Sequence, residues 1–313
     1  MLSPILSRIL RGSKSNITHQ RITGGQLLSR YRGKIVGEDP TMVETFALRA
    51  SGEERLAGAA DLAAASAALP EGAYTTLRTY DGDGVPHLDA HARRLEDSVA
   101  LQGRPTGLDR TRLRRGLAAA LEQTRFPESR VRITFAPPDI FVSVEPFAPL
   151  PESVYEDGVT CVTVPLRREV PQSKDTRFLG PAQSAYRALP PGAHEGLLVA
   201  EDGALLEGLS SNVFVVLDGV LRTEEARALR GTTRALVLEL AQGLVPVHRE
   251  AATRADLPRA SEAFLTSVSR EVVPVVRVDD VVVGHGRPGS LARELRARYQ
   301  ARMKRDAEHL LAG

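Results

Sequence analysis

Lysine is scarce in this chain. Only four of its 41 lysine and arginine residues are lysines, and between residues 42 and 303 the single lysine is Lys174, in the stretch VPQSKDTRFLG. An arginine side chain stays protonated, whereas a desolvated lysine amine can lose its proton and condense with a carbonyl group. Lys174 is therefore either an ordinary solvated surface residue or a functional amine, and the rest of the sequence must decide between the two.

Cysteine and long apolar runs are also scarce. The single cysteine, Cys161, excludes a disulfide within the chain and any zinc site built from several cysteines. It lies in the apolar run VTCVTV, which predicts a buried strand residue rather than a nucleophile. No apolar run approaches the roughly 18 residues that a membrane helix needs. These features favour a cytoplasmic protein without a membrane segment.

Acidic residues are missing at the start of the chain. Residues 1–41 hold seven basic residues and only two acids, Glu38 and Asp39, whereas the remainder is slightly acidic. The basic character is therefore confined to the leader, which argues against a nucleic-acid surface on the folded body. The leader resembles an organellar transit peptide in composition. Because the composition changes at Met42, we instead favour a disordered leader or a wrongly assigned start.

The length of 313 residues allows one large domain or two ordinary ones. In the first half, residues 45–69 are rich in alanine and predict a partly helical segment. Alternating residues on both sides of a DGDG turn predict a hairpin at 72–88. Apolar periodicity predicts helices at 88–103 and 108–124, followed by strands at 129–137 and 139–147. We expect an N-terminal α+β domain over residues 42–150.

The second half, residues 151–313, is expected to form a C-terminal domain of antiparallel strands and helices. Its first strand, at 158–169, leads toward Lys174. Residues 194–223 predict antiparallel strands with turns at Asp202-Gly203 and Asp218-Gly219. A helix is expected to start at the threonines of GTTR and run through 231–243, then strands at 262–267 and 272–284. A long charged helix, from 290 to about 311, closes the chain.

An aldehyde cofactor on Lys174 would require further residues. The common cofactor of this kind, pyridoxal 5'-phosphate, needs an arginine and backbone N–H groups for its phosphate and an acidic partner for its ring nitrogen. The helix start at Gly231–Arg234, Glu207 at the end of an apolar strand, and Arg94 on a helix are candidates. Taken singly, each has an ordinary alternative as a helix cap, a strand end facing water or a solvated helix face.

Four segments considered together resemble one family. In the order HLDAHARRLEDS, SKDTRFL, HEGLLVAEDGALLEGLSSNVFVVLDGVLRT and LRGTTRALVLELA, they are similar to the class IV aminotransferases. These fold-type IV pyridoxal-phosphate enzymes include branched-chain aminotransferases, D-amino-acid aminotransferases and aminodeoxychorismate lyases. The resemblance covers about residues 70 to 285, and the EG-x-SSN-x-F stretch is its most specific part. It implies a two-domain α+β fold with the cofactor in the cleft between the domains.

The resemblance also implies roles for individual residues. Lys174 matches the catalytic lysine that forms the Schiff base with the cofactor. Glu207 matches the partner of the pyridinium nitrogen, and Arg94 matches the phosphate-binding arginine. Thr232 and Thr233 match the turn that holds the phosphate.

A second group of cofactor contacts and the substrate pocket are expected from the same resemblance. Ser267, Val268 and Ser269 fall where the family places another phosphate contact. Val268 departs from the usual threonine, so this contact would use a backbone N–H group or a serine. The substrate pocket is expected to be lined by Tyr74, Thr76, Leu209, Ser210 and Ser211.

Two arginines are left open between two roles. Arg177 and Arg132 would each bind a substrate carboxylate or be held in a salt bridge. The segment VRITFAPPD, which contains Arg132, lacks the carboxylate-binding patterns of D-amino-acid aminotransferases and of many branched-chain enzymes. The residues after Lys174 are also not the usual asparagine-rich run. These departures leave the substrate open.

The expected reaction is amino transfer from an apolar, possibly branched-chain, amino acid to a 2-oxo acid such as 2-oxoglutarate. Alternatives are a lyase like aminodeoxychorismate lyase that releases pyruvate, a D-specific aminotransferase, and a non-catalytic paralogue. The family implies a homodimer that binds small amino and oxo acids. No metal, nucleic-acid or membrane partner is expected.

Overall fold

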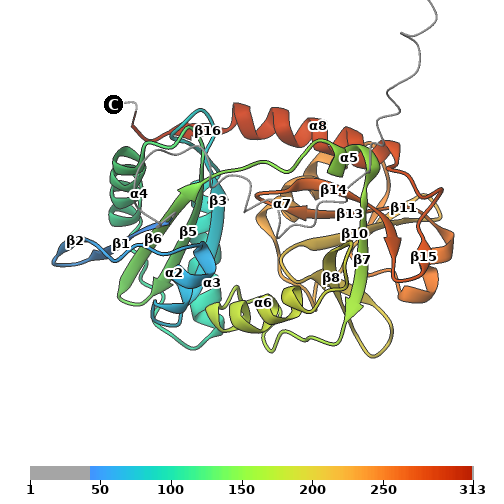
Figure 1. Ribbon diagram of the computed structural model, residues 1–313, viewed down its shortest axis with the longest axis horizontal. Coiled ribbons are helices and arrows are strands. Elements are labelled where there is room, and N and C mark those ends of the chain that lie inside the picture. The colour runs from blue at the N-terminus through green and yellow to red at the C-terminus, as the bar shows by residue number, and fades with distance from the viewer. Residues whose placement is uncertain (1–42, 312–313) are drawn as a thin grey trace, which may run out of the picture. The chain divides into compact units, whose positions relative to one another are not determined.

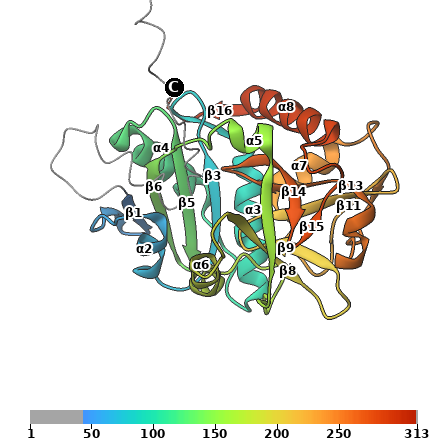
Figure 2. The same ribbon diagram turned by 45° about the vertical axis from the view of Figure 1, so that its right-hand side comes forward.

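Two β-sheets with separate hydrophobic cores organise the structure. The computed structural model describes residues 43–311 (Figures 1 and 2), so the predictions made for residues 1–41 lie outside the described residues. The first sheet has five antiparallel strands in the order β2-β1-β6-β5-β3. Its strands are β1 (Glu44–Arg49), β2 (Gly52–Arg55), β3 (Ala73–Arg78), β5 (Ser129–Ala136) and β6 (Asp139–Pro146).

Side-chain alternation gives this sheet two different faces. Along β5, Val131, Ile133 and Phe135 are fully buried, whereas Arg130 and Arg132 between them are half-buried. Successive strand residues point to opposite faces, so the sheet has one apolar face and one face that carries arginines. The apolar face belongs to the core, and the other face is available for a site.

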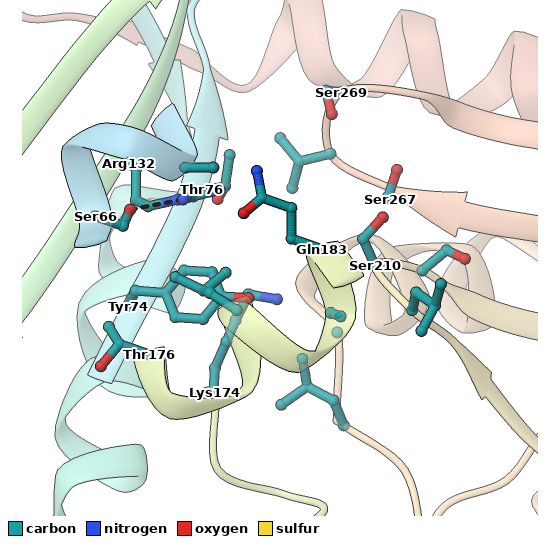
Figure 3. A pocket seen from close by; sticks show the side chains of 18 of the residues that line it. Ser66, Tyr74, Thr76, Arg132, Lys174, Thr176, Gln183, Ser210, Ser267 and Ser269 are labelled. Atoms are coloured by element: carbon teal, nitrogen blue, oxygen red, sulfur yellow. Dashed lines mark hydrogen bonds between the residues drawn. The ribbon is translucent and has the colours of Figure 1, made fainter. Parts of the chain in front are cut away.

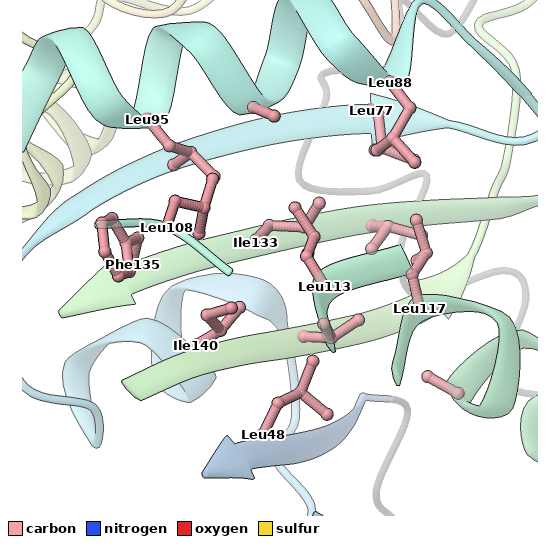
Figure 4. Packing of buried hydrophobic residues seen from close by; sticks show 14 of the residues in the cluster. Leu48, Leu77, Leu88, Leu95, Leu108, Leu113, Leu117, Ile133, Phe135 and Ile140 are labelled. Atoms are coloured by element: carbon pink, nitrogen blue, oxygen red, sulfur yellow. The ribbon is translucent and has the colours of Figure 1, made fainter. Parts of the chain in front are cut away.

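Two amphipathic helices cover the apolar face. Helices α3 (Leu88–Leu101) and α4 (Arg110–Thr124) contribute leucines to one cluster with the strands, as Figure 4 shows. Leu95 and Leu113 are almost completely buried against Ile133 and Leu48 in this cluster. Each such leucine stabilises the fold by about 1.5–3 kcal/mol relative to an exposed side chain. A short helix, α2 (Leu62–Ala67), lies beside the arginine-bearing face, where its Leu62 carbonyl accepts a hydrogen bond from Arg132.

The second sheet has nine strands, and six of them close on themselves. The chain of pairings β10-β13-β14-β7-β8-β9 returns to β10 through the pair Asn212–Glu207. A closed sheet leaves no free edge among these strands. The strands are β7 (Val159–Val164), β8 (Ala193–Val199), β9 (Leu205–Gly208), β10 (Asn212–Leu217), β11 (Val220–Arg222), β12 (Val247–His248), β13 (Ala260–Ser267), β14 (Glu271–Val278) and β15 (Val281–Val282).

Helices cover the outside of this closed sheet. Helices α7 (Thr232–Leu240) and α8 (Ser290–Arg305) pack Val237 and Leu295 against Phe214 and Phe264, whose rings stack 5.1 Å apart. Two further helices are α5 (Ser153–Asp157) and α6 (Leu179–Arg187). Helix α8 then leads back toward the first sheet, where β16 (Ala307–His309) pairs with β4 (Gly84–Pro86), as Figures 1 and 2 show. None of the helices within residues 43–311 is long and apolar enough to cross a membrane.

The α+β class is confirmed, and three local predictions are wrong. The partly helical character of residues 45–69 is confirmed by α2, although residues 44–55 form the paired strands β1 and β2. The expected hairpin at 72–88 does not form a ladder, since β3 pairs with β5 and β4 pairs with β16. The last helix ends at Arg305 rather than near residue 311. The second sheet is not wholly antiparallel, because β7 runs parallel to β8 and β14, and β11 runs parallel to β12.

Gly72 provides a test of how tightly β3 packs at its start. A Cβ atom there would lie 2.2 Å from the carbonyl oxygen of Phe135, which is backbone and cannot move aside. We expect Gly72→Ala to lower the free energy of unfolding by about 1–3 kcal/mol, as overpacking does elsewhere. Gly107→Ala is the matched control, because a Cβ at Gly107 meets nothing within 4 Å. Urea denaturation of both variants checks this, and equal midpoints would contradict the packing argument.

Candidate active site

One pocket of about 510 Å³ lies between the two sheets. Its size is typical of a site for a small molecule. The structure brings all of the predicted site residues to its wall, and Figure 3 shows several of them. These residues are Tyr74, Thr76, Arg94, Arg132, Lys174, Arg177, Glu207, Leu209, Ser210, Ser211, Thr232, Thr233, Ser267, Val268 and Ser269.

The backbone of Lys174 is held from two sides. Its N–H group donates to the Ser98 hydroxyl of α3 at 3.0 Å, and its carbonyl accepts from the N–H group of Tyr74 on β3 at 2.8 Å. Two residues after Lys174, the Thr176 N–H group donates to the carbonyl of Gly72 at 2.9 Å. A loop whose main-chain groups are satisfied in this way is fixed in position. The lysine side chain therefore starts from a defined point on the pocket wall.

The amine of Lys174 lies in a desolvated and electropositive place. Its Nζ is 4.7 Å from the ring centroid of Tyr74, and within residues 43–311 it makes no salt bridge. Burial lowers the pKa of Lys174 well below its ordinary value, and the charges of Arg94 and Arg168 lower it further, although Glu207 acts in the opposite direction. The amine is thus biased toward the neutral, nucleophilic form.

Glu207 is a buried carboxylate held in a fixed orientation. It lies on β9 at the closure of the second sheet, and its side chain is 3% exposed. Oε1 accepts from Nε of Arg168 at 2.9 Å, and Oε2 accepts from the backbone N–H group of Leu229 at 3.2 Å. Arg168 in turn lies over the ring of Phe178, 3.7 Å from its centroid. Each carboxylate oxygen keeps a free lone pair toward the pocket.

A separate part of the wall has the donors that a phosphate requires. Helix α7 begins at Thr232, and the side-chain hydroxyls of Thr232 and Thr233 are buried without a hydrogen-bond partner within residues 43–311. The guanidinium of Arg94 enters from α3, where its Nη2 donates to the hydroxyl of Thr75 and its buried Nε has no partner in the described chain. Burial lowers the pKa of Arg94 to about 10, which leaves it charged at neutral pH. A dianion would satisfy these groups together.

His91 of α3 contacts the same threonine as Arg94. Its Nδ1 is 2.7 Å from the hydroxyl of Thr75, which is the same hydroxyl that Arg94 contacts. Burial lowers the pKa of His91 well below its ordinary value, and the neighbouring charge of Arg94 lowers it further. The neutral imidazole therefore adds no second positive charge beside Arg94.

The residues of pyridoxal 5'-phosphate chemistry are thus present in a compatible arrangement. A neutral-biased amine, a buried carboxylate and an unpartnered anion cradle share one pocket. Val268 lies in the turn between β13 and β14, flanked by Ser267 and Ser269, and all three line the pocket. The unsatisfied buried donors fit a phosphate group, whereas they are costly when left without one. Among residues 43–311, no cluster of three or more metal-ligating side chains occurs.

The two undecided arginines have different surroundings. Arg177 is paired with Asp175 at 2.6 Å, and its side chain is 48% exposed at the pocket rim. Arg132 instead donates through Nη1 to the carbonyl of Leu62 and to the hydroxyl of Ser66, and within residues 43–311 it has no carboxylate partner (Figure 3). Burial lowers the pKa of Arg132. Arg132 is therefore the one of the two that still needs an anion.

Two pocket arginines that are held by buried carboxylates were missed by the sequence analysis. Arg168 orients Glu207, and Arg270 forms an ion pair at 2.8 Å with Glu195, which is completely buried. Arg168 stands only six residues before Lys174, in LRRE, but nothing in the sequence distinguishes it from Arg167. Arg270 follows directly after Ser269, and its partner Glu195 is 75 residues away. Only the fold brings these residues together.

Known proteins with similar sequences are aminotransferases. The branched-chain-amino-acid aminotransferase of Pseudomonas aeruginosa is 26% identical over 73% of this chain and 82% of its own length. The D-alanine aminotransferase of Bacillus licheniformis is 28% identical over 74% of this chain and 87% of its own length.

Solved structures share the fold. One of them is the branched-chain amino acid aminotransferase of T.th., crystallised with pyridoxamine 5'-phosphate. It matches with a TM-score of 0.71 and 21% identity, over 85% of this chain and 98% of its own. The 4-amino-4-deoxychorismate lyase of Pseudomonas aeruginosa matches with a TM-score of 0.64 and 25% identity, over 79% of this chain and 96% of its own.

The family model for amino-transferase class IV matches residues 72–278, which include Lys174, Glu207, Arg94 and the start of α7. Together with the fold and the pocket, this match decides the family. The chain belongs to the class IV aminotransferases, the fold-type IV enzymes that use pyridoxal 5'-phosphate.

Proposed function

We propose that this enzyme moves an amino group from an apolar, branched-chain L-amino acid to a 2-oxo acid such as 2-oxoglutarate. The observation that carries the proposal is the composition of the wall around Arg132. Small apolar residues of α2 and α6, among them Ala63, Ala67 and Ala182, line the pocket beside this single arginine without a carboxylate partner. Such a wall has apolar surface for a branched side chain and one cation for the carboxylate of a dicarboxylic partner.

The cofactor would be held by the residues that the structure leaves unsatisfied. Arg94, Thr232 and Thr233 would bind its phosphate, with support from the Ser267–Ser269 turn. When bound, pyridoxal 5'-phosphate supplies an aldehyde for condensation with amines and a ring that accepts the electron pair of the substrate Cα–H bond. Glu207 would keep a proton on the ring nitrogen, because a buried carboxylate stabilises a positive charge beside it. Arg168 would fix the direction of that carboxylate.

Lys174 would carry the proton in this reaction. With the cofactor and an amino acid bound, its Nζ atom would be a free amine in a desolvated pocket. A lysine with a lowered pKa can accept the Cα proton at neutral pH and then return it to the neighbouring carbon of the cofactor. The hydrogen bonds of its backbone to Ser98 and Tyr74 would keep the Lys174 main chain in the same position in both half-reactions.

A lyase is the second candidate, supported by the structural likeness to 4-amino-4-deoxychorismate lyase. The same amine, carboxylate and anion cradle would serve an elimination that releases pyruvate. The apolar wall around α2 favours amino transfer from an apolar substrate over this alternative.

Half-reactions measured with single substrates test the proposal. We expect L-leucine, L-isoleucine and L-valine to convert the bound cofactor to its amine form, seen as bleaching of its yellow absorbance, and 2-oxoglutarate to restore it. Lys174→Ala is the control, and it should lose proton transfer by about 10²–10⁴-fold while still binding the cofactor. Bleaching only by D-amino acids, or pyruvate release from aminodeoxychorismate, would overturn the proposed substrate.

The lowered pKa of Lys174 predicts an unusual pH dependence. An ordinary lysine loses about tenfold in neutral amine for each pH unit below its pKa of about 10.4. In the cofactor-free protein we expect the rate of capture of pyridoxal 5'-phosphate, trapped with borohydride, to fall by less than tenfold per unit between about pH 9 and pH 7, because the pKa of Lys174 lies well below its ordinary value. A tenfold fall per unit over that range would show that the amine is not desolvated.

We also infer that the enzyme is a cytoplasmic homodimer. The family resemblance supports the dimer, and the single buried Cys161 suits a reducing compartment. Light scattering on the purified protein should give twice the mass of 33.8 kDa, and a monomeric mass would contradict the inference.

A further inference from the structure

A buried charged cluster on the pocket wall is not used by the reaction described above. Glu195 of β8 is completely buried, and its Oε2 lies 2.8 Å from Nη2 of Arg270, at the end of the β13–β14 turn. The same oxygen accepts from the hydroxyl of Ser211 at 2.9 Å, and Oε1 accepts from the backbone N–H group of Gly196 at 3.1 Å. A buried ion pair with this many partners is held in one geometry.

The guanidinium of Arg270 is anchored along one side only. Its Nη2 also donates to the hydroxyl of Ser210 at 2.8 Å, and its Nε donates to the hydroxyl of Ser267 at 3.2 Å. Arginine has five N–H donors, and these bonds use three of them. Within residues 43–311, Nη1 makes no hydrogen bond, and the side chain is 15% exposed where it lines the pocket. The hydroxyl of Tyr186, which is 2.6 Å from the Ser210 hydroxyl, also lies beside this guanidinium, so the remaining donors face both this phenol and the pocket.

The surroundings of Arg270 differ from those of Arg132 on the opposite side. Ser210, Ser267 and Ser269 lie together on one side of the pocket, and Arg132 and Ser66 lie on the other (Figure 3). The Arg132 wall includes the small apolar residues Ala63 and Ala67 of α2, which leave space for a substrate side chain. The Arg270 wall presents hydroxyl groups and a rigidly held cation, which suit a group that every substrate carries. Among amino acids and 2-oxo acids that group is the carboxylate next to the reacting carbon.

We propose that Arg270, positioned by Glu195, binds the α-carboxylate of the substrate with help from Ser210 and Ser267, and so sets the direction in which the substrate lies. The inference rests on the proposed function for the identity of the substrate. The Nη1 group donates hydrogen bonds to the substrate carboxylate, and the salt bridge to Glu195 fixes the orientation of the guanidinium. The side chain of the substrate then points to the wall that holds Arg132.

Two unreactive probes separate α-carboxylate binding from other roles. 4-Methylvalerate has one carboxylate, and glutarate has two. Isothermal titration of the cofactor-loaded enzyme should show that Arg270→Met weakens both probes by a similar factor of about 10–100, the loss of a charge-assisted hydrogen bond pair. Arg270→Lys should recover part of that loss. In steady-state assays the KM values for all substrates should rise more than kcat falls, with the visible spectrum of the cofactor unchanged.

A matched control tests direct contact against the general field of the pocket. Arg130 also lines the pocket but is paired with Glu145. Arg130→Met removes the same charge, and it should leave the affinity for both probes within about twofold. If Arg130→Met weakened the probes as much as Arg270→Met, the effect would be electrostatic and the proposal would fail.

The remaining outcomes also decide the question. Arg270→Met leaves the buried Glu195 carboxylate without a partner and could unfold the protein. In that case the double variant Arg270→Met/Glu195→Gln, which also removes the negative charge, is tested instead of the single variant. Loss of affinity for glutarate alone would place Arg270 at a distal carboxylate and overturn the proposal, as would unchanged affinity for both probes. Because the probes do not react, binding can be lost in the variant even if the wild type fails to transfer amino groups. Failure of the inference and failure of the proposed function are thus distinguishable.

Discussion

The concentration of positive charge in one small pocket is the constraint on which the rest of the site depends. Six arginines and Lys174 line the pocket. Most of this charge is balanced one pair at a time by carboxylates, and those paired with Arg168 and Arg270 come from distant parts of the chain. These pairs are Arg130–Glu145, Arg168–Glu207, Arg177–Asp175 and Arg270–Glu195. Within residues 43–311, only Arg94 and Arg132 among the pocket arginines lack a carboxylate, and a pocket with this imbalance is suited to bind anions.

The same imbalance explains the state of Lys174. A desolvated ammonium group among arginines is costly, so the proton leaves the lysine before it would leave any guanidinium. The neutral lysine keeps its position because hydrogen bonds to its backbone hold it, and no ion pair of its side chain is needed. Ser98 and Tyr74 fix the main chain on either side of the residue. The reactive atom can therefore be neutral and free of a partner without becoming loosely placed.

The parts of the site that sequence reasoning could predict are those whose chemistry is local. Lys174 is distinguished by its rarity, and the start of α7 by its Gly-Thr-Thr turn, which made both candidates, but their roles were expected only from the resemblance to the family. The strand at β5 and the helix at α3 were likewise predicted from local patterns. Each of these signals lies within a few residues and depends on side-chain type alone.

The missing parts depend on pairings between distant segments. Strands β1 and β2 lie next to an alanine-rich stretch, and their short, partly charged sequence ETFALR to GEER has little alternation to show. The strand β16 forms by pairing with β4, which lies more than 200 residues earlier in the chain. The residues after Arg305 therefore leave α8 for a reason that helical periodicity does not reveal. Arg168 looks like Arg167 until Glu207 is seen beside it, and Arg270 looks like a surface residue until Glu195 is. Roles that arise from one contact across the fold leave no trace in composition.

The division of the pocket wall suggests how one arrangement of reactive groups can serve different substrates. The groups that would handle the cofactor, Arg94, Glu207 and Lys174, lie on α3, on the closed second sheet and on a segment tied to β3. These supports are buried and mutually packed, so changing them would disturb the fold. Arg132 lies in the middle of the inner strand β5 and contacts α2, and Ser210 and Arg270 lie in turns. Substitutions of the small α2 residues and of Ser210 would change what is bound while the proton-carrying groups stay where they are, whereas Arg132 and Arg270 are tied to buried partners.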